Sequence, residues 1–411
     1  MLPSASSDRT RVALLGSTGS IGRQALDVLT AHADRFEVVA LAAGRDVDTL
    51  SGQVARHKPR LVALADERAA AGLDLPPASR LVGGADALEV IAADDDVDLV
   101  LVGTSGIVSL RPVLAALARG KVVATANKET LVAGGHLVMP LARQLAARSD
   151  AGPDARAAAG PLAWLRPIDS EHSAIWQCLA GEQRSDVARL VLTASGGPLR
   201  EWTAKQLAAA TPADALAHPT WNMGAKITID SATLVNKGLE VIEACWLYDI
   251  DDAQVDVVIH PQSIVHSLVE FADGSLKAQL GLPDMRIPIQ YALSYPRHLP
   301  SPAPRLVPAD MSTLTFEAPD EMRFPALAIC RDAYRRGPRA GAALIAADEV
   351  AVGRFLAGTL DFPGIAKICA RGVDRFDEPG PPPDLVELFE LDRAVREWAA
   401  TESLSSASVR P

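Results

Sequence analysis

The chain has 411 residues, enough for two or three domains with cores of their own, and 48% hydrophobic against 22% charged residues is typical of a soluble globular protein. A formal net charge of −11 argues against nucleic-acid and anionic-membrane partners, so we expect neither. The four cysteines are scattered without a CxxC pair, which excludes a disulfide framework and a zinc site of the common kind. Residues 1–10 lack the apolar core of a signal peptide and no apolar run reaches membrane-spanning length, so a cytoplasmic protein is predicted.

The first predicted elements are a strand, a glycine-rich turn and a helix. Arg11–Leu15 has the pattern of a buried strand, the turn Gly16–Gly22 follows with the spacing GxxGxxG, and a helical pattern continues to Leu29. This order brings backbone N–H groups and a helix N-terminus against a pyrophosphate, although such a turn is specific only in the right context. We therefore expect a nucleotide-binding domain at the N-terminus.

The second predicted strand, Phe36–Leu41, leads to Gly44, Arg45 and Asp46 at the distance where ribose specificity is set. An NAD enzyme usually places a carboxylate directly at that strand end. Here Arg45 comes first, which favours a 2′-phosphate and hence NADP. The alternative is that Arg45 is an ordinary solvated surface cation.

Further alternation of strands and helices predicts a doubly wound parallel sheet, with elements at residues 60–64, 98–103, 110–119 and 121–126. The last of these strands runs into Asn127, Lys128 and Glu129. Ligands bind outside the carboxyl ends of such strands, so this triplet lies where a nicotinamide and a substrate would meet. The alternative is a capped helix start. The small, Gly- and Pro-interrupted segment 149–161 reads as a loop or domain junction.

The middle third offers carboxylates for a metal. Leu162–Ile168 reads as a strand that ends at Asp169, and in extended chain Asp169 and Glu171 point the same way. With Glu240 they would form an all-oxygen site, which suits Mg²⁺ or Mn²⁺ and does not suit zinc. The alternative is again a capped helix start.

A phosphate site is predicted after the next strand. Leu190–Thr193 leads into the small-residue turn Ala194–Pro198, whose Ser195 hydroxyl and backbone N–H groups resemble a phosphate-binding turn. Together with Ser231, Asn236 and Lys237 this turn would surround a phosphate dianion.

A loop with an isolated tryptophan comes before a helix that carries polar side chains. Trp221 is flanked by His218-Pro219 and Met223-Gly224, which favours a mobile lid over the substrate. A tryptophan that plugs a domain interface is the alternative. A short apolar alternation at Ile227 and Ile229 follows.

The helix is expected to begin at Asp230-Ser231. One face carries Asn236, Lys237 and Glu240, which are neighbours at helical spacing and suit an anionic, metal-chelating ligand. Gly238 inside the helix costs about 1 kcal/mol against Ala and calls for a reason such as close approach. The alternative is an ordinary amphipathic helix with an intrahelical Lys237–Glu240 pair.

The remaining pattern consists of strands, a linker and helices. Strands are predicted at Val255–Ile259, Ser263–Phe271 and Ser275–Leu280, with a hairpin turn at Asp273-Gly274. Edge strands of this kind often pair between subunits, so we expect a homodimer. A Pro-rich segment follows, and then four helical patterns, at residues 324–335, 340–357, 363–371 and 383–400, predict a small bundle.

Seven motifs resemble, in family order and with near-family spacing, those of 1-deoxy-D-xylulose 5-phosphate reductoisomerases. They lie at Gly16–Gly22, Asn127–Glu129, Asp169–His172, Ser195–Pro198, His218–Glu240, His260–Ser263 and Gly281–Arg286. The resemblance implies an α/β protein with a Rossmann-like NADPH-binding domain (1–158) and a catalytic α/β domain with dimerising strands (159–294). A flap (218–226) belongs to the catalytic domain, and a linker (295–320) and a helical C-terminal domain (321–411) follow.

The resemblance also implies the reaction and the roles of single residues. The metal would chelate the substrate's carbonyl and hydroxyl oxygens, a retro-aldol/aldol rearrangement would give an aldehyde, and NADPH would reduce it to 2-C-methyl-D-erythritol 4-phosphate, an isoprenoid precursor. The implied NADPH contacts are Thr18, Gly19, Ser20, Ile21, Gly44, Arg45, Asp46, Asn127, Glu129 and Gly224. The implied metal ligands are Asp169, Glu171 and Glu240. The implied substrate contacts are Lys128, Ser170, Glu171, Ser195, His218, Ser231, Asn236, Lys237 and Glu240, with Trp221 and Met223 in the flap. Lys128 and Glu171 are the candidates for proton transfer.

Some positions depart from the family pattern. Asp46 stands where the family more often has Asn beside the 2′-phosphate, and Ile345 and Asp348 replace two Asn residues in a helix near the C-terminus. We expect these last two to change packing without loss of activity. Two other functions compete: a plain NADP-dependent phosphosugar dehydrogenase, and a catalytically silent NADP-sensing protein.

Overall fold

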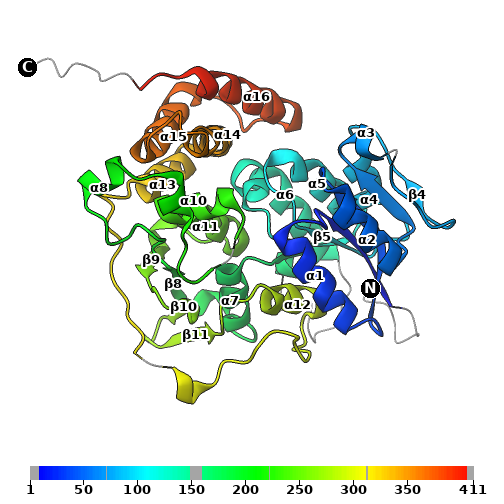
Figure 1. Cartoon of the computed structure of the whole chain (residues 1–411). Helices are drawn as coiled ribbons and strands as arrows, with labels where there is room; N and C mark the ends of the chain where they lie inside the picture. The colour runs from blue at the N-terminus through cyan, green and yellow to red at the C-terminus, as the bar shows by residue number, and fades with distance from the viewer. Residues whose placement is uncertain (1–8, 71, 149–159, 222, 312, 405–411) are drawn as a thin grey trace, which may run out of the picture. The chain divides into compact units, whose positions relative to one another are not determined.

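The computed structural model describes residues 9–70, 72–148, 160–221, 223–311 and 313–404 (Figure 1). The chain forms two compact units. Unit 1 consists of Met1–Asn127, Leu137–Arg184 and Asp284–Leu306, and unit 2 of Lys128–His136, Ser185–Pro283 and Val307–Pro411. The predicted NADPH-binding domain, catalytic domain, linker and C-terminal domain are defined by function and not by compactness. Their boundaries remain predictions. Most of the predicted loop 149–161 lies outside the described residues. Among the helices described, none is long and apolar enough to cross a membrane.

Unit 1 is built on a parallel sheet, as predicted. Its seven strands are β1 (Thr10–Leu15), β2 (Phe36–Ala43), β3 (Leu61–Leu64), β4 (Arg80–Leu81), β5 (Leu99–Val102), β6 (Val122–Thr125) and β7 (Leu165–Pro167), in the order β4-β3-β2-β1-β5-β6-β7. The strands read as runs of Val, Leu and Ala because both faces of the sheet are covered, and β1, β3 and β5 are almost wholly buried. The order of the strands reverses between β1 and β5, which is where ligands bind in doubly wound sheets.

Helices cover the sheet of unit 1. They are α1 (Ser20–Ala31), α2 (Val47–His57), α3 (Glu67–Ala70), α4 (Ala87–Ala93), α5 (Leu110–Ala118), α7 (Ser170–Cys178), α12 (Arg286–Ser294) and the second part of α6 (Lys128–Arg148). The strand expected at 162–168 is shorter than predicted. Residues Gly160–Ala163 form a 3₁₀ turn, because Gly160 has φ +52° and Pro161 cannot donate to a strand.

Unit 2 has a mixed sheet of four strands in the order β11-β10-β8-β9, with bounds Leu276–Leu280, Val265–Phe271, Val187–Ala194 and Val255–Ile259. Strands β10 and β11 form the predicted hairpin, and Gly274 in its turn has φ +82°. The other helices are α8 (Ala204–Ala208), α9 (Pro212–Leu216), α10 (Ala225–Thr233), α11 (Val235–Tyr248), α13 (Ala326–Arg336), α14 (Pro338–Leu356), α15 (Phe362–Phe376) and α16 (Leu385–Thr401). The last four confirm the predicted helical bundle.

The helix around Asp230 differs from the expectation. Helix α10 begins at Ala225, and Leu234 adopts a left-handed conformation (φ +64°) that separates it from α11. A helix start at Asp230-Ser231 was therefore wrong. Two isoleucines are too few to define a strand period, and the ion pair from Lys226 to Asp230, four residues apart, supports a helix through this segment.

Candidate functional site

The glycine-rich turn is shaped for close approach of chain segments in unit 1. Gly16 has φ +85°, and a Cβ atom there would lie 2.7 Å from the carbonyl carbon of Gly103. A Cβ at Gly22 would lie 2.3 Å from the Gly16 oxygen, so both glycines are required by the turn. Gly19 is the N-cap of α1, and no side chain caps this helix end. Its N–H groups, next to Thr18, Ser20 and Ile21, are thus suited to a pyrophosphate.

The end of β2 presents an exposed cation. Gly44, Arg45 and Asp46 are exposed, and Arg45 forms no ion pair with any residue that the structure describes. The carboxylate of Asp46 accepts a hydrogen bond from the Thr49 N–H at 3.0 Å and caps α2. The Thr49 side chain, and then this backbone bond, lower the pKa of Asp46. Asp46 thus acts as a helix cap and leaves Arg45 available for a phosphate.

The triplet after β6 is buried. The Asn127 amide donates to the carbonyls of Thr104 and Gly106, both at 2.9 Å, and so fixes the loop after β5. Lys128 and Glu129 begin α6 with only 7% of each residue exposed. They start a helix, and they are also charged groups inside the protein, which require partners.

Asp169 and Glu171 do not share one face of an extended strand, so that expectation was wrong. Strand β7 ends at Pro167, Asp169 is the N-cap of α7, and Glu171 lies in the first turn of that helix. The Glu171 N–H donates to Asp169 Oδ1 at 3.1 Å, and the Ser170 hydroxyl donates to Glu171 Oε2 at 2.6 Å. The carboxylates still lie together, in unit 1, at the carboxyl end of β7.

Glu240 is the centre of a buried polar cluster in unit 2. Its side chain is 1% exposed, Asn236 Nδ2 donates to its Oε1 at 2.6 Å, and Lys237 Nζ forms an ion pair with its Oε2. Lys128 Nζ lies 3.4 Å from Oε1 and 3.9 Å from the carboxylate of Glu243. The predicted convergence of Asn236, Lys237 and Glu240 is confirmed. The intrahelical Lys237–Glu240 pair also exists, but in a buried cluster and not on a surface helix.

Gly238 has a structural reason for its place in α11. A Cβ atom there would lie 2.5 Å from Cys330 Sγ on α13. The close approach that the glycine allows is therefore that of a second helix, not of a ligand, and Gly238 gives no support to a binding site.

Two side chains of the predicted phosphate site, Ser195 and Ser231, lie together in unit 2, and the predicted substrate contact His218 lies beside them. Ser195 Oγ is 2.9 Å from His218 Nε2 and 3.4 Å from Ser231 Oγ. Burial lowers the pKa of His218, and its Nδ1 accepts from the Trp221 N–H at 2.9 Å, so the neutral ring carries its hydrogen on Nε2. The ring therefore presents a donor to Ser195 and to any anion bound there.

The two large side chains of the predicted flap are neither buried in the core nor fully exposed. Trp221 and Met223 are partly exposed, and the Trp221 ring lies 6.2 Å from that of His266 at an interplanar angle of 56°. Gly224 ends the loop as the N-cap of α10.

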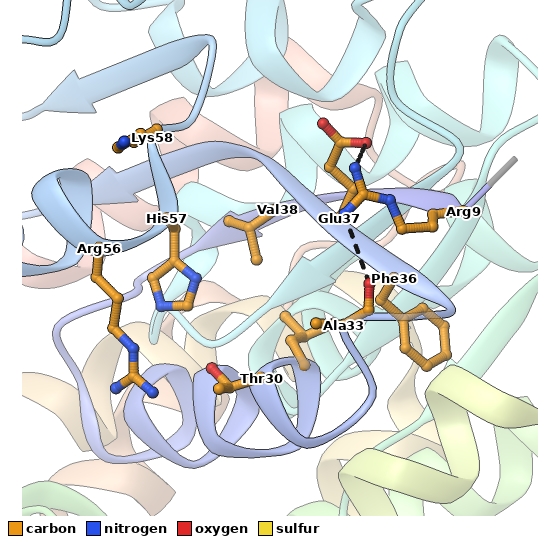
Figure 2. Close-up of a pocket in the computed structure, with 10 residues that line it drawn as sticks. Arg9, Thr30, Ala33, Phe36, Glu37, Val38, Arg56, His57 and Lys58 are labelled. Carbon is orange, nitrogen blue, oxygen red and sulfur yellow. Dashed lines mark hydrogen bonds and ion pairs between the residues drawn. The ribbon is translucent and has the colours of Figure 1, made fainter.

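A separate hollow of about 440 Å³ lies at the amino ends of β1 and β2 (Figure 2). Figure 2 shows the Arg9 side chain bridging to Glu37 and to the Ala33 carbonyl at its rim. None of the predicted site residues lines this hollow, which is at the opposite strand ends from the glycine-rich turn.

The sequence did not lead us to expect that the side chains of Lys226, Asp230 and Asp348 lie together. Lys226 Nζ lies 2.6 Å from Asp230 Oδ2 and 2.8 Å from Asp348 Oδ2. The available signal was the four-residue spacing of Lys226 and Asp230, but Asp348 is remote in the chain.

Comparisons with known proteins agree along the chain. The family model "1-deoxy-D-xylulose 5-phosphate reductoisomerase" matches residues 12–135, its C-terminal domain model residues 165–248, and the "DXP reductoisomerase C-terminal domain" model residues 280–398. The reductoisomerase of Pelotomaculum thermopropionicum is 49% identical over 94% of this chain and 96% of its own length. That of Thermomicrobium roseum is 47% identical, covering 95% and 97%.

Solved structures agree as well. The reductoisomerase from Zymomonas mobilis in complex with NADPH has a TM-score of 0.83 at 38% identity, covering 96% of this chain and 98% of that one. A DOX-P reductoisomerase in complex with NADPH, fosmidomycin and magnesium has a TM-score of 0.85 at 36% identity, covering 95% and 97%. The chain belongs to the 1-deoxy-D-xylulose 5-phosphate reductoisomerase family.

Proposed function

We propose that this chain converts 1-deoxy-D-xylulose 5-phosphate into 2-C-methyl-D-erythritol 4-phosphate, with NADPH as reductant and Mg²⁺ or Mn²⁺ as metal, in the non-mevalonate route to isoprenoid precursors. The observation that carries this proposal is the buried carboxylate of Glu240 with Lys128, Asn236 and Lys237 around it. A silent NADP-sensing protein needs no such cluster, and charged groups are costly to bury without use.

Asp169, Glu171 and Glu240 are our proposed metal ligands. Asp169 and Glu171 lie at the start of α7 in unit 1, and Glu240 is buried in α11 of unit 2. The set fits Mg²⁺ or Mn²⁺, because all its donors are carboxylate oxygens, whereas zinc prefers nitrogen and sulfur. When bound, the ion would polarise the oxygens of the substrate as a Lewis acid.

The nucleotide is assigned to the glycine-rich turn of unit 1. The uncapped N-terminus of α1 supports a pyrophosphate there, and Arg45, exposed and free of ion pairs with described residues, supports a 2′-phosphate. We accordingly assign Thr18, Gly19, Ser20, Ile21, Gly44, Arg45, Asp46, Asn127, Glu129 and Gly224 to NADPH. NADPH would supply the hydride.

The remaining roles follow from charge and hydrogen bonding. Ser195, His218 and Ser231 offer hydroxyl and N–H donors to the phosphate, and Asn236 and Lys237 are assigned to the same ligand. Remote phosphate binding orients the reacting end of a substrate. Lys128 is our candidate for moving protons around the bound oxygens, together with Glu171, whose neighbour Ser170 is assigned to the substrate. Trp221 and Met223 would cover the ligand.

We also propose a homodimer. Strand β11 is the edge of the unit 2 sheet, four of its five residues are exposed, and Leu276 and Leu280 are among them. An edge strand with exposed apolar side chains invites pairing with a second chain. The four cysteines are buried and form no disulfide bond, which supports a reducing compartment such as the cytoplasm.

The test is NADPH oxidation with 1-deoxy-D-xylulose 5-phosphate, with and without Mn²⁺, followed by NMR of the product. The proposal requires metal-dependent oxidation and a branched tetritol phosphate. An unbranched alcohol would identify the plain phosphosugar dehydrogenase instead. NADPH binding without any turnover would favour the alternative of a catalytically silent NADP-sensing protein.

A further inference from the structure

The ammonium group of Lys226 lies among carboxylates from three helices of unit 2. Its Nζ is 2.6 Å from Asp230 on α10, 2.8 Å from Asp348 on α14 and 3.7 Å from Glu129 at the start of α6. Both aspartate side chains are fully buried, whereas the Lys226 side chain is 28% exposed. We call these four residues the Lys226 cluster.

The Lys226 cluster has one cation for three carboxyl groups, so the ammonium is the only group of the cluster that can balance their negative charge. A buried carboxylate without a partner is strongly destabilising. Burial opposes the charge of Lys226, but Asp230, Asp348 and Glu129 together raise its pKa well above the usual value, so it stays charged. Removal of Lys226 would leave Asp230 and Asp348 buried without a cation.

The cluster is attached to the proposed substrate site. Lys226 lies in the first turn of α10, directly after the loop that carries Trp221, and Asp230 immediately precedes Ser231. Glu129 immediately follows Lys128 in α6. One ammonium group therefore ties the helix of Ser231 to the helix of Lys128.

Helix α10 is held on two sides. A Cβ atom at Gly197 would lie 2.7 Å from the Ser231 oxygen, so the turn that carries Ser195 packs directly on α10. Helix α14 in turn packs closely on α6, because a Cβ at Gly341 would lie 2.7 Å from the Val132 oxygen. With α14 and α6 packed in this way, the ion pairs of Lys226 fix where α10 lies against both.

We propose that Lys226 is a positioning residue for substrate binding, and that its pairing with Asp230, Asp348 and Glu129 sets the distance between Ser231 and the Ser195 turn at which a phosphate is bound. The inference rests on the proposed function, since it takes Ser195 and Ser231 as phosphate ligands. The carboxylate of Asp348 makes the contact between Lys226 and α14 an ion pair.

The test uses two variants of Asp348 that keep Lys226 paired with Asp230. Asp348→Asn keeps an oxygen that accepts from Lys226, and Asp348→Leu removes the acceptor. Lys226→Met and Lys226→Arg are measured beside them, and Lys367→Met serves as the control, because Lys367 is an exposed lysine of the same unit. The readouts are kcat, the KM for 1-deoxy-D-xylulose 5-phosphate, competitive inhibition by inorganic phosphate, and the melting temperature.

We expect Asp348→Leu to raise both the substrate KM and the inhibition constant of phosphate by about tenfold, while the melting temperature stays the same or rises. Asp348→Asn and Lys367→Met should remain within about twofold of the unmodified protein in both constants. Lys226→Met should raise the substrate KM and the inhibition constant of phosphate at least as much as Asp348→Leu does. Lys226→Arg should raise both constants less than Lys226→Met.

Several outcomes would overturn the inference. One is an unchanged KM and phosphate inhibition in Asp348→Leu. Another is a loss of affinity that only tracks a fall in melting temperature, which would mean general loosening. If Lys226→Met does not fold, the KM and phosphate inhibition of the two Asp348 variants decide whether the inference holds. If the unmodified protein does not turn over the substrate, the proposed function fails, and phosphate affinity, measured by calorimetry on the same variants, still judges the inference.

Discussion

The two regions that carry the proposed chemistry are built in opposite ways. In unit 1, Gly19 of the glycine-rich turn and Arg45 after β2 are exposed, and the binding groups of the turn are mainly backbone N–H groups at a helix end. Around Glu240 in unit 2, the binding groups are charged side chains inside the protein, with Lys237 3% and Glu240 1% exposed. An exposed turn needs little support from other residues. Buried charges need partners, and those partners come from α6 and α11.

The largest expected effect is loss of the proposed metal site. Glu240→Gln or Asp169→Asn should lower kcat about a thousandfold or more, because the Lewis acid contributes several kcal/mol of transition-state stabilisation. NADPH affinity should stay within about twofold, since the glycine-rich turn is formed by other residues. Steady-state kinetics and NADPH titration check both points. Near-normal turnover of either variant at saturating Mg²⁺ would mean that the site is misassigned.

The next effect concerns the flap. Trp221→Ala should lower turnover by roughly 10- to 100-fold, because water would no longer be excluded from the bound substrate. Its melting temperature should fall by less than about 3 °C, since Trp221 is only partly buried.

Trp176→Ala is the matched control for that flap variant. Trp176 is 4% exposed and stacks on Tyr295 with 4.4 Å between ring centroids, so truncation should cost about 3–5 kcal/mol of stability. The lid interpretation is wrong if Trp221→Ala is as unstable as Trp176→Ala while its activity per folded molecule is unchanged.

The exposed region should show a smaller effect. Arg45→Ala should lower the preference for NADPH over NADH by roughly ten- to a hundredfold, because a charge-assisted hydrogen bond to the 2′-phosphate is lost. Arg56→Ala, at the other end of α2 and also exposed, is the control and should leave the preference unchanged. Equal use of both cofactors by the unmodified protein would rule out the role of Arg45.

The smallest effect is on the pH dependence of stability. Burial, and then the charge of Asp348, raise the pKa of Asp230 well above its usual range. The folded protein therefore holds a proton that the unfolded chain releases at about pH 4, and the free energy of unfolding falls as pH rises from there toward the raised pKa. Asp348→Asn removes one cause of the raised pKa, so its unfolding free energy should fall less over this window, by about 1 kcal/mol.

Urea unfolding between pH 5 and 8 measures this difference. The ionisable groups that interact with Asp230 are Lys226, Glu129, Asp348, Cys330 and Cys369, and Glu349 interacts with Lys226 and Glu129. Burial raises the pKa of both thiols, so neither titrates in the window. Parallel pH curves for the variant and the unmodified protein would show that Asp348 does not raise the pKa of Asp230.

Much of the fold could be predicted because its signals are local. Runs of Val, Leu and Ala between helical patterns predicted the parallel sheet of unit 1, and the hairpin at Gly274 and the four last helices followed from turn residues and apolar spacing. The error at the start of α11 came from a backbone conformation that has no local signal in the sequence. Leu234 adopts a left-handed conformation that its side chain gives no reason to expect, so the break between α10 and α11 was not visible.

The candidate site could be predicted only where its residues share a short segment. Asn236, Lys237 and Glu240 lie within two turns of one helix, so their convergence followed from spacing alone. The position of Glu171 was wrong because β7 already ends at Pro167 and Asp169 caps α7, so Glu171 lies in the first turn of a helix. The Lys226 cluster was missed, because Glu129, Asp230 and Asp348 meet only through the packing of α6, α10 and α14.

The central claim is that carboxylates from the end of β7 and from the buried cluster of α11 bind one metal ion together. Calorimetric titration of Mn²⁺ into the unmodified protein, Asp169→Asn and Glu240→Gln tests this most directly. We predict one ion per chain for the unmodified protein, and at least about tenfold weaker binding in each single variant, since each removes a charged ligand. Binding of Mn²⁺ by Glu240→Gln with unchanged affinity would contradict the claim, because the metal would then be held without the buried carboxylate.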